Sequence, residues 1–446
     1  NGEGGVCMAA QVSRRAFMAG AALALAGGAL AGLTGCGEEP GLKAALLDTG
    51  ELVFTDSLGK LSGKVEKSWP LDESGAYSYT DRAPWHESAR KVTSVRFDAA
   101  VKPVSCAWWF SELETCQNID LTNLDTSACT SMEGMFSYCP KVASLDLSAL
   151  NTAACTSMTS MFAGCSGLAK LDVSGFDTAT LASLDSAFYG CSSLEALNLS
   201  SWQTGRVATM ANIFSGCAAL ASLEFGEGFS TSEVTDMSGM FNGCRNLSGI
   251  DVSGFDTSKV TLTTSMFEKC SALVSLDVSS FGTSQVTSMR GMFRDCSSLT
   301  ELDLSSFVTA QVMNFSNMLR DCKALKTVNV SSFDTSRATD MNYMFYGDES
   351  LESLDLDNFD TSRVATMESM FEGCSSLTEL DISGFDMSNA WDTRSLFKDC
   401  SNLAKLELGE WNLAKAEDFG NMFAGCDKLS DSFIEEHTPE PIDYDV

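Results

Sequence analysis

Most of this chain repeats one pattern of apolar and polar residues every 26 positions. The clearest marker is a cysteine slot, whose members are 26 residues apart except for a gap of 27 between Cys217 and Cys244. Leu113 fills the slot in the first repeat and Asp348 fills it in a later one. The slot's cysteines are Cys139, Cys165, Cys191, Cys217, Cys244, Cys270, Cys296, Cys322, Cys374, Cys400 and Cys426. These thirteen registers at a fixed period indicate a repeat architecture rather than two or three globular domains.

Each repeat contains a predicted strand and a predicted turn. In "LTELDLS" (Leu299–Ser305) the leucines alternate with Glu301 and Asp303, as in a strand with one buried face. "FDTS" (Phe255–Ser258) offers the side chains of a turn and of a helix N-cap. "VTDMSGMFNGC" (Val234–Cys244) is apolar at offsets 0, 3, 6, 7 and 10. That spacing suits either one face of a helix or a short strand leading into a tight helical turn.

A single repeat has too few apolar side chains to offset the entropy of ordering its backbone, so neighbouring repeats must stack. The predicted fold is therefore a repeat solenoid. We expect a right-handed coil of about 13 repeats over residues 104–429, each with one short parallel strand plus a turn or short helix.

The segments that flank the array do not repeat. Residues 42–103 are interpreted as a small N-terminal cap, with a hairpin turning at Thr49-Gly50 and a strand within Lys91–Val101. Such a cap covers the open end of a repeat array. Residues 430–446 form an acidic tail with two prolines, for which we predict no regular structure.

Residues 1–35 are interpreted as an export signal. Arg14 and Arg15 resemble the pair of a twin-arginine signal, and the apolar run that follows ends in "LTGC", which resembles a bacterial lipobox. The resemblance implies cleavage before Cys36 and a lipid on its thiol, with residues 36–41 as a lipidated tether. An ordinary cysteine after a secretory signal is the alternative. No later apolar stretch is long enough to span a bilayer, so lipid is the only predicted membrane contact.

Charge and composition exclude several functions. The net charge of −31 argues against nucleic acid and against an anionic membrane surface as ligands, because both require basic patches. The two histidines, His86 and His437, lie near no nucleophile motif, and no glycine-rich phosphate loop follows a strand. We therefore predict no catalytic residue, no enzyme activity and no cofactor.

The cysteine slot has three explanations. Neighbouring coils would place equivalent cysteines within disulfide range. The slot nevertheless accepts Asp348 and Leu113, which favours buried thiols packing as small apolar groups. A metal site is disfavoured, because no C-x-x-C pair or partnered histidine is present.

The repeat resembles that of the BspA-like bacterial leucine-rich-repeat surface proteins. The likeness rests on units such as "VSGFDTSKVT" (Val252–Thr261) followed by "MFEKCSAL" (Met266–Leu273), and on the preceding segment Pro84–Phe110. It covers roughly residues 84–429. It implies a leucine-rich-repeat-like solenoid on the cell surface that serves binding or adhesion, in some members to host extracellular-matrix proteins. It does not transfer a particular ligand.

The outward strand positions form the candidate concave binding face. An acidic column and a more variable column lie side by side there, and the acidic side chains are expected either to hydrogen-bond to adjacent turns or to recruit cations. The candidate residues are Asp146, Asp172, Asp251, Asp277, Asp303, Asp355, Asp381, Lys170, Glu301, Glu379 and Lys405. The predicted function is a lipid-anchored, extracytoplasmic surface protein whose solenoid binds an extracellular protein. The alternative is a structural spacer with no specific ligand. No metal site and no oligomeric state are predicted.

Overall fold

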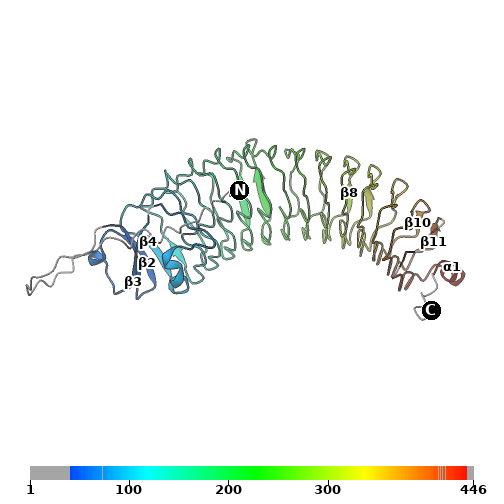
Figure 1. Cartoon of the computed structure of the whole chain (residues 1–446), viewed down its shortest axis with the longest axis horizontal. Helices are drawn as coiled ribbons and strands as arrows, with labels where there is room; N and C mark the ends of the chain where they lie inside the picture. The colour runs from blue at the N-terminus through cyan, green and yellow to red at the C-terminus, as the bar shows by residue number, and fades with distance from the viewer. Residues whose placement is uncertain are drawn as a thin grey trace, which may run out of the picture. The chain divides into compact units, whose positions relative to one another are not determined.

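The structure is a computed structural model that describes residues 41–72, 74–409, 411, 413, 415, 416 and 418–438. All of these belong to one compact unit, Pro40–Val446. The export-signal arginines Arg14 and Arg15 and the lipid-attachment residue Cys36 lie outside the described residues. Figure 1 shows the coils of this unit following one another in a curved stack, which begins near β4 and ends at α1.

The N-terminal cap is built around a small mixed sheet. Strands β1 (Lys43–Leu47) and β2 (Glu51–Thr55) form an antiparallel hairpin. Gly50 closes its turn at a φ of 84°, where an added Cβ would lie 2.7 Å from the Lys91 carbonyl oxygen. The remaining elements of this part are η2 (Leu58–Lys60), β3 (Val65–Pro70), η3 (Pro84–Lys91), β4 (Ser94–Phe97) and β5 (Asn118–Ile119). The sheet order is β3-β1-β2-β4-β5, so the cap sheet continues directly into the first coil.

The cap and the first coil share one aromatic core. The ring of Phe54 lies 5.2 Å from that of Trp85 and 5.6 Å from that of Trp109. The indole N–H of Trp85 donates to the Trp109 carbonyl at 2.7 Å. The first coil therefore buries its open end against the cap, as a repeat array needs.

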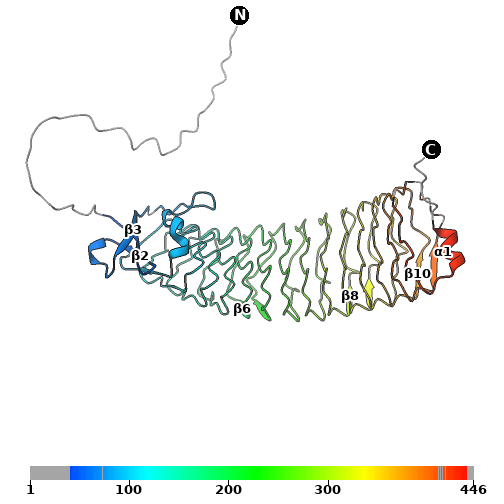
Figure 2. The same ribbon diagram turned by 90° about the horizontal axis from the view of Figure 1, so that it is seen from below.

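The rest of the described chain is a β-solenoid of about 12 turns, which confirms the predicted repeat fold. Its strand segments show the expected alternation, since Leu302 and Leu304 are buried while Glu301 and Asp303 are exposed. The assigned strands are β6 (Ala196–Leu199), β7 (Ser222–Phe225), β8 (Glu301–Asp303), β9 (Thr327–Asn329), β10 (Glu379–Ile382) and β11 (Lys405–Leu408). Figure 2 shows β6 and β8 along the same edge of the stack.

One short parallel strand was predicted in each repeat, but these strands do not join into one continuous sheet. They pair in parallel two by two, β6 with β7, β8 with β9 and β10 with β11. Unbroken pairing occurs instead at another slot, where single parallel bridges link every coil from Ser131 to Asp418. The coils are thus tied together most regularly on a face other than that of the strands.

We call the segment from each bridge residue to the following cysteine, such as Ser288–Cys296, the turn ladder. Phe293 donates its N–H to the carbonyl of Met318 in the next coil at 2.9 Å, and Gly291 and Asp295 donate to that coil in the same way. The intervening N–H groups donate to the carbonyl three residues earlier in their own coil, at 3.1 Å. Every second N–H therefore links two coils, and the others close local turns.

The turn ladder contains no α-helix, so the helical alternative for Val234–Cys244 is wrong. Gly291 and Asp295 have φ of 60° and 59°, in the left-handed region that interrupts a helix. The second alternative is closer to the structure, because a bridge at Asp236 precedes a series of tight turns. The "FDTS" segments likewise form turns without a following helix.

Apolar side chains of the turn ladder stack along the interior. The ring of Phe371 lies 5.8 Å from that of Phe345 and 5.6 Å from that of Phe397, nearly parallel to both. The Cys374 thiol donates to the Phe345 carbonyl at 3.1 Å. All fifteen cysteines recorded in the described residues are buried free thiols. Burial raises the pKa of Cys296 to about 12, so its thiol stays protonated and serves packing.

A buried threonine column joins the coils on another side. The Thr335 hydroxyl donates to the Asp360 carbonyl at 2.9 Å and accepts the Asp360 N–H at 2.8 Å. Equivalent hydroxyls, including those of Thr309 and Thr361, also donate to the next coil. This column is the structural role of the threonine in the "FDTS" turns.

Asp348 replaces a thiol in the core. Its side chain is fully buried, and one carboxyl oxygen accepts the Cys322 N–H at 2.8 Å. The other oxygen has no partner among the described residues. Burial raises the pKa of this carboxyl well above its ordinary value.

The tail begins with a short helix, so the prediction of no regular structure is wrong for its first part. Helix α1 (Asp431–His437) is capped by Ser430, whose hydroxyl accepts the Phe433 N–H at 3.2 Å. The Phe433 ring lies 6.2 Å from that of Phe423 in the preceding coil. The helix therefore packs against the last described part of the core.

Candidate interaction surface

We call the outward-facing side of the strand segments the strand face. The parallel pairings place the predicted columns side by side, since Glu379 is paired with Lys405 and Asp381 with Glu407. All eleven candidate residues are exposed, and they occupy equivalent outward positions of their coils. The strand face thus brings the predicted residues together as two adjacent columns.

The seven aspartates of the acidic column each accept a hydrogen bond from the N–H two residues further on. For Asp303 the donor is Ser305, and for Asp381 it is Ser383, both at 2.9 Å. The same bond is 2.9–3.1 Å long in all seven cases. Each carboxylate therefore closes the turn after its strand segment, which is one of the two predicted roles.

These hydrogen bonds shift the titration of the column. The side chain and then the N–H of Ser383 lower the pKa of the Asp381 carboxyl. The corresponding serines lower the pKa of further members of the column, which are Asp146, Asp172, Asp251, Asp277 and Asp303. These side chains are solvent-exposed anions at neutral pH, and the turn hydrogen bond of each engages a single carboxylate oxygen.

The acidic column lacks cationic partners. None of its seven aspartates makes an ion pair within the described part of the chain, and neither does Glu301 or Glu379. Elsewhere, equivalent positions of adjacent coils carry opposite charges. Lys259 contacts Glu233 at 2.7 Å, and Lys323 contacts Glu349 at 2.7 Å. The strand face is thus predominantly anionic: its described aspartates make no ion pair, and its cations are few, Lys405 pairing with Glu407 at 3.3 Å and, after Ser383, also lowering the pKa of Asp381.

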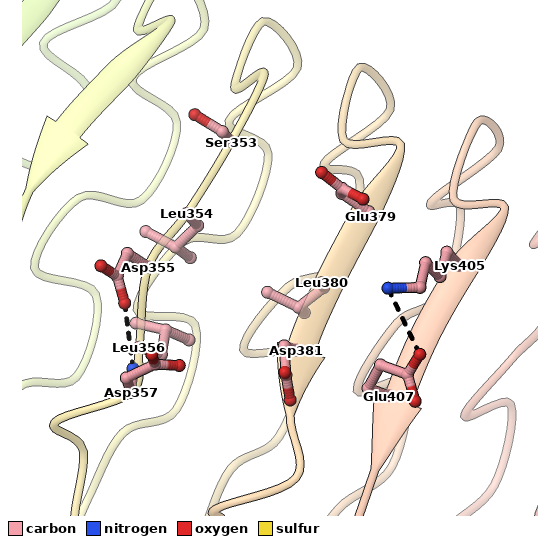
Figure 3. A pocket seen from close by; sticks show the side chains of 10 residues that line it. All are labelled: Ser353, Leu354, Asp355, Leu356, Asp357, Glu379, Leu380, Asp381, Lys405 and Glu407. Atoms are coloured by element: carbon pink, nitrogen blue, oxygen red, sulfur yellow. Dashed lines mark hydrogen bonds and ion pairs between the residues drawn. The ribbon is translucent and has the colours of Figure 1, made fainter.

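A groove opens in the strand face where strand pairing is interrupted. Residues 353–356 belong to no assigned strand and lie between the β8·β9 and β10·β11 pairs in sequence. Leu354 is only partly buried. The groove has a volume of about 380 Å³ and is lined by Ser353, Leu354, Asp355, Leu356, Asp357, Glu379, Leu380, Asp381, Lys405 and Glu407. Figure 3 shows Glu379, Leu380 and Asp381 following one another along β10, beside the coil that carries Leu354.

A second groove, of about 560 Å³, lies on the same face. Its apolar lining includes Leu276, Leu302 and Val328, and its carboxylates include Glu301 and Asp303. The strand face therefore repeats one combination, an apolar floor between coils with carboxylates around it.

The repeat pattern alone did not identify the grooves. Leu354 and Leu380 occupy the slot of Leu302, one of the strand leucines predicted to face inward, and Leu380 is buried. A signal was present at Asp357, which stands where equivalent repeats have a serine such as Ser305 or Ser383. This replacement adds a carboxylate to the lining of the first groove.

Other chemistries find little support in the described residues. In that part of the chain, no three histidine, cysteine or acidic side chains gather to hold a metal ion. His86 contacts Glu112 at 3.1 Å, and Arg82 contacts the other oxygen of Glu112 at 2.6 Å. These contacts fasten the cap to the first coil. No helix within the described ranges is long and apolar enough to cross a membrane.

The chain is similar to proteins of one family and to several solved structures. The family described as "Mycoplasma protein of unknown function, DUF285" matches residues 104–225, 222–328 and 314–436. A leucine-rich repeat protein from Bacteroides ovatus has 14% identity and a TM-score of 0.41, over 88% of this chain and 93% of that one. A leucine rich cell surface protein from Faecalibacterium prausnitzii has 16% identity and a TM-score of 0.39, over 83% and 94%. No curated protein matches in sequence.

Proposed function

The chain belongs to the DUF285 family of BspA-like leucine-rich-repeat proteins, and from this premise we propose that it is a lipid-anchored bacterial surface protein whose strand face binds an extracellular protein, of host or matrix origin. The candidate surface comprises the two columns described above. In this proposal Arg14 and Arg15 direct export, and residues 36–41 tether the solenoid to a lipid on Cys36.

One observation carries the binding role. The seven aspartates of the acidic column make no ion pair among the described residues, although this solenoid pairs lysine with glutamate between coils elsewhere. Unpaired like charges in a column repel one another, so a surface selected only for cohesion would gain from alternating signs. A partner that supplies the missing positive charge accounts for their retention.

A structural spacer is the second candidate. It is favoured by the regularity of the turn ladder, whose bridges run without interruption from Ser131 to Asp418. A spacer needs an array of defined length and a fixed attachment, but no distinctive outer face.

The anchor is tested by fractionating cells and by labelling with a radioactive fatty acid. Wild-type protein should incorporate label and sediment with membranes, whereas Cys36→Ala should do neither. Cys36→Ala that still carries label or remains in the membrane fraction would refute the lipid assignment.

Binding is tested with the full chain carrying Cys36→Ala, immobilised and exposed to purified serum and extracellular-matrix proteins at low and high salt. The proposal expects saturable binding of at least one protein, weakened by salt. Absence of saturable binding across the panel would favour the spacer.

A further inference from the structure

The first groove of the strand face has the shape and charge to accept one kind of partner residue. The inference rests on the proposed function and makes its partner specific. The floor contains the partly exposed Leu354, with the buried Leu380 behind it, and the cavity measures about 380 Å³. Covering a partly exposed leucine in a surface groove with apolar groups of a partner favours binding, because it removes apolar surface from water.

The charge around this floor is almost entirely negative. The lining carboxylates are Asp355, Asp357, Glu379, Asp381 and Glu407. The one cation of the lining, Lys405, contacts Glu407 at 3.3 Å. The other four carboxylates have no ion-pair partner among the described residues, and Figure 3 shows two of them, Glu379 and Asp381, flanking Leu380 on the same strand.

We propose that this groove seats a lysine or arginine side chain from an extended segment of a partner protein. The methylene stem would cover Leu354, and the charged head would reach the carboxylates of Glu379 and Asp381. Lysine and arginine combine an apolar stem with a cationic end, which matches a leucine floor beside carboxylates. An extended segment suits the site because the second groove, with Glu301 and Asp303, places further carboxylates along the same face.

Other ligands fit less well. An anionic lipid or nucleic acid would be repelled by this rim and by the net charge of −31. A purely apolar segment would leave the carboxylates unpaired. A bare metal ion would make no use of the leucine floor, and the described residues provide no three-ligand cluster.

The test uses the full chain with Cys36→Ala and a labelled peptide that alternates lysine and serine. The probe control is the same peptide with acetylated lysines, which keeps the stem and removes the charge. The groove variant combines Glu379→Gln with Asp381→Asn. The matched variant combines Glu435→Gln with Glu436→Gln on α1, which changes the net charge equally at exposed positions outside the groove.

The groove variant should fold normally, because asparagine already occupies the aspartate slot. Asn198 accepts the Ser200 N–H at 2.9 Å, and Asn329 accepts the Ser331 N–H at 3.2 Å. A circular-dichroism melt identical to that of the parent confirms this. The peptide should then bind the groove variant about tenfold or more weakly than the parent, and the α1 variant within about twofold of the parent.

Two results would overturn the proposal. Equal weakening in the groove and α1 variants would mean that only the overall charge attracts the peptide. Equal binding of the acetylated peptide would mean that the carboxylates do not recognise the cation. Either result leaves the proposed function intact if the immobilised chain still binds a protein of the panel. Peptide binding without any panel binding would instead support the groove and refute the host or matrix partner.

Discussion

The turn ladder and the strand face come from the same 26-residue repeat, yet they differ in how the coils are joined. Backbone hydrogen bonds link every coil in the turn ladder, whereas grooves open on the strand face. In the turn ladder, alternate N–H groups bond to the next coil and the rest close local turns, so the backbone donors are satisfied within the stack. On the strand face, strands pair only two by two and leave grooves between the pairs. In the proposed function, cohesion and recognition therefore lie on different sides of each coil.

The largest expected contrast concerns apolar side chains on the two sides. Phe371→Ala should lower the free energy of unfolding by about 3–5 kcal/mol, because its fully buried ring stacks on Phe345 and Phe397. Leu354→Ala should cost under about 2 kcal/mol, because the side chain is already partly exposed. Urea unfolding followed by circular dichroism measures both variants. Similar losses would mean that the strand face is as tightly packed as the turn ladder.

A smaller contrast concerns two threonines of one coil. Thr335→Val leaves the Asp360 N–H and carbonyl without their partner and should cost about 2–4 kcal/mol. Thr339→Val is the matched control, since its exposed hydroxyl only donates to the Met313 carbonyl at 3.2 Å. That variant should change stability by under about 0.5 kcal/mol. Equal effects in the two variants would exclude the buried threonine column as a link between coils.

The third prediction concerns Asp348, whose buried carboxyl occupies the cysteine slot of one repeat. Asp348→Cys should stabilise the fold by about 1–2 kcal/mol at neutral pH, because a thiol fits this slot in the other repeats without a buried carboxyl. The folded-state pKa of Asp348 is raised, so its contribution is intact below the ordinary carboxyl pKa and is lost as pH rises toward the raised value. The stability difference between variant and parent should therefore widen from about pH 4.5 to about pH 7. A difference that stays constant over this range would show that the folded and unfolded states bind the same number of protons there, so that the pKa of Asp348 is not raised in the folded protein.

Much of the fold was predictable, because a strict period indicates that equivalent residues of successive repeats stack on one another. The inward leucines and phenylalanines, the cap hairpin and the buried thiols follow from apolar spacing or turn chemistry. The sequence did not decide the secondary structure of the turn ladder, because apolar offsets of 0, 3, 6, 7 and 10 suit a helix equally well. The deciding signal is local. The slot of Gly291 holds serine or asparagine in many other repeats, residues that favour turns over helices.

The candidate surface was predictable as columns but not as grooves. Outward positions follow from the strand alternation, and the hydrogen bonds of Asp303 and its equivalents match one of the two roles predicted for the acidic column, the closing of adjacent turns. The groove at Leu354 depends on which strand segments pair, and every repeat carries nearly the same strand sequence. Pairing in twos is a property of the assembled stack, so no single repeat encodes it.

The smallest expected effect tests whether the acidic column serves the fold through its charge or through its hydrogen-bond acceptor. Asp381→Asn keeps an oxygen for the Ser383 N–H and should leave the melting midpoint at pH 7 unchanged, whereas Asp381→Ala removes it and should lower the midpoint slightly. The pKa of Asp381 is lowered by this serine, so the contribution of its carboxylate is present at neutral pH and lost as pH falls. Melts at pH 7 and in mild acid should therefore separate aspartate from asparagine only in acid. If asparagine matches aspartate at pH 7, the fold does not require the negative charge there, and its presence along the strand face belongs to recognition. If asparagine instead destabilises as much as alanine, the charge itself holds the turn, and the case for a cationic partner loses its main support.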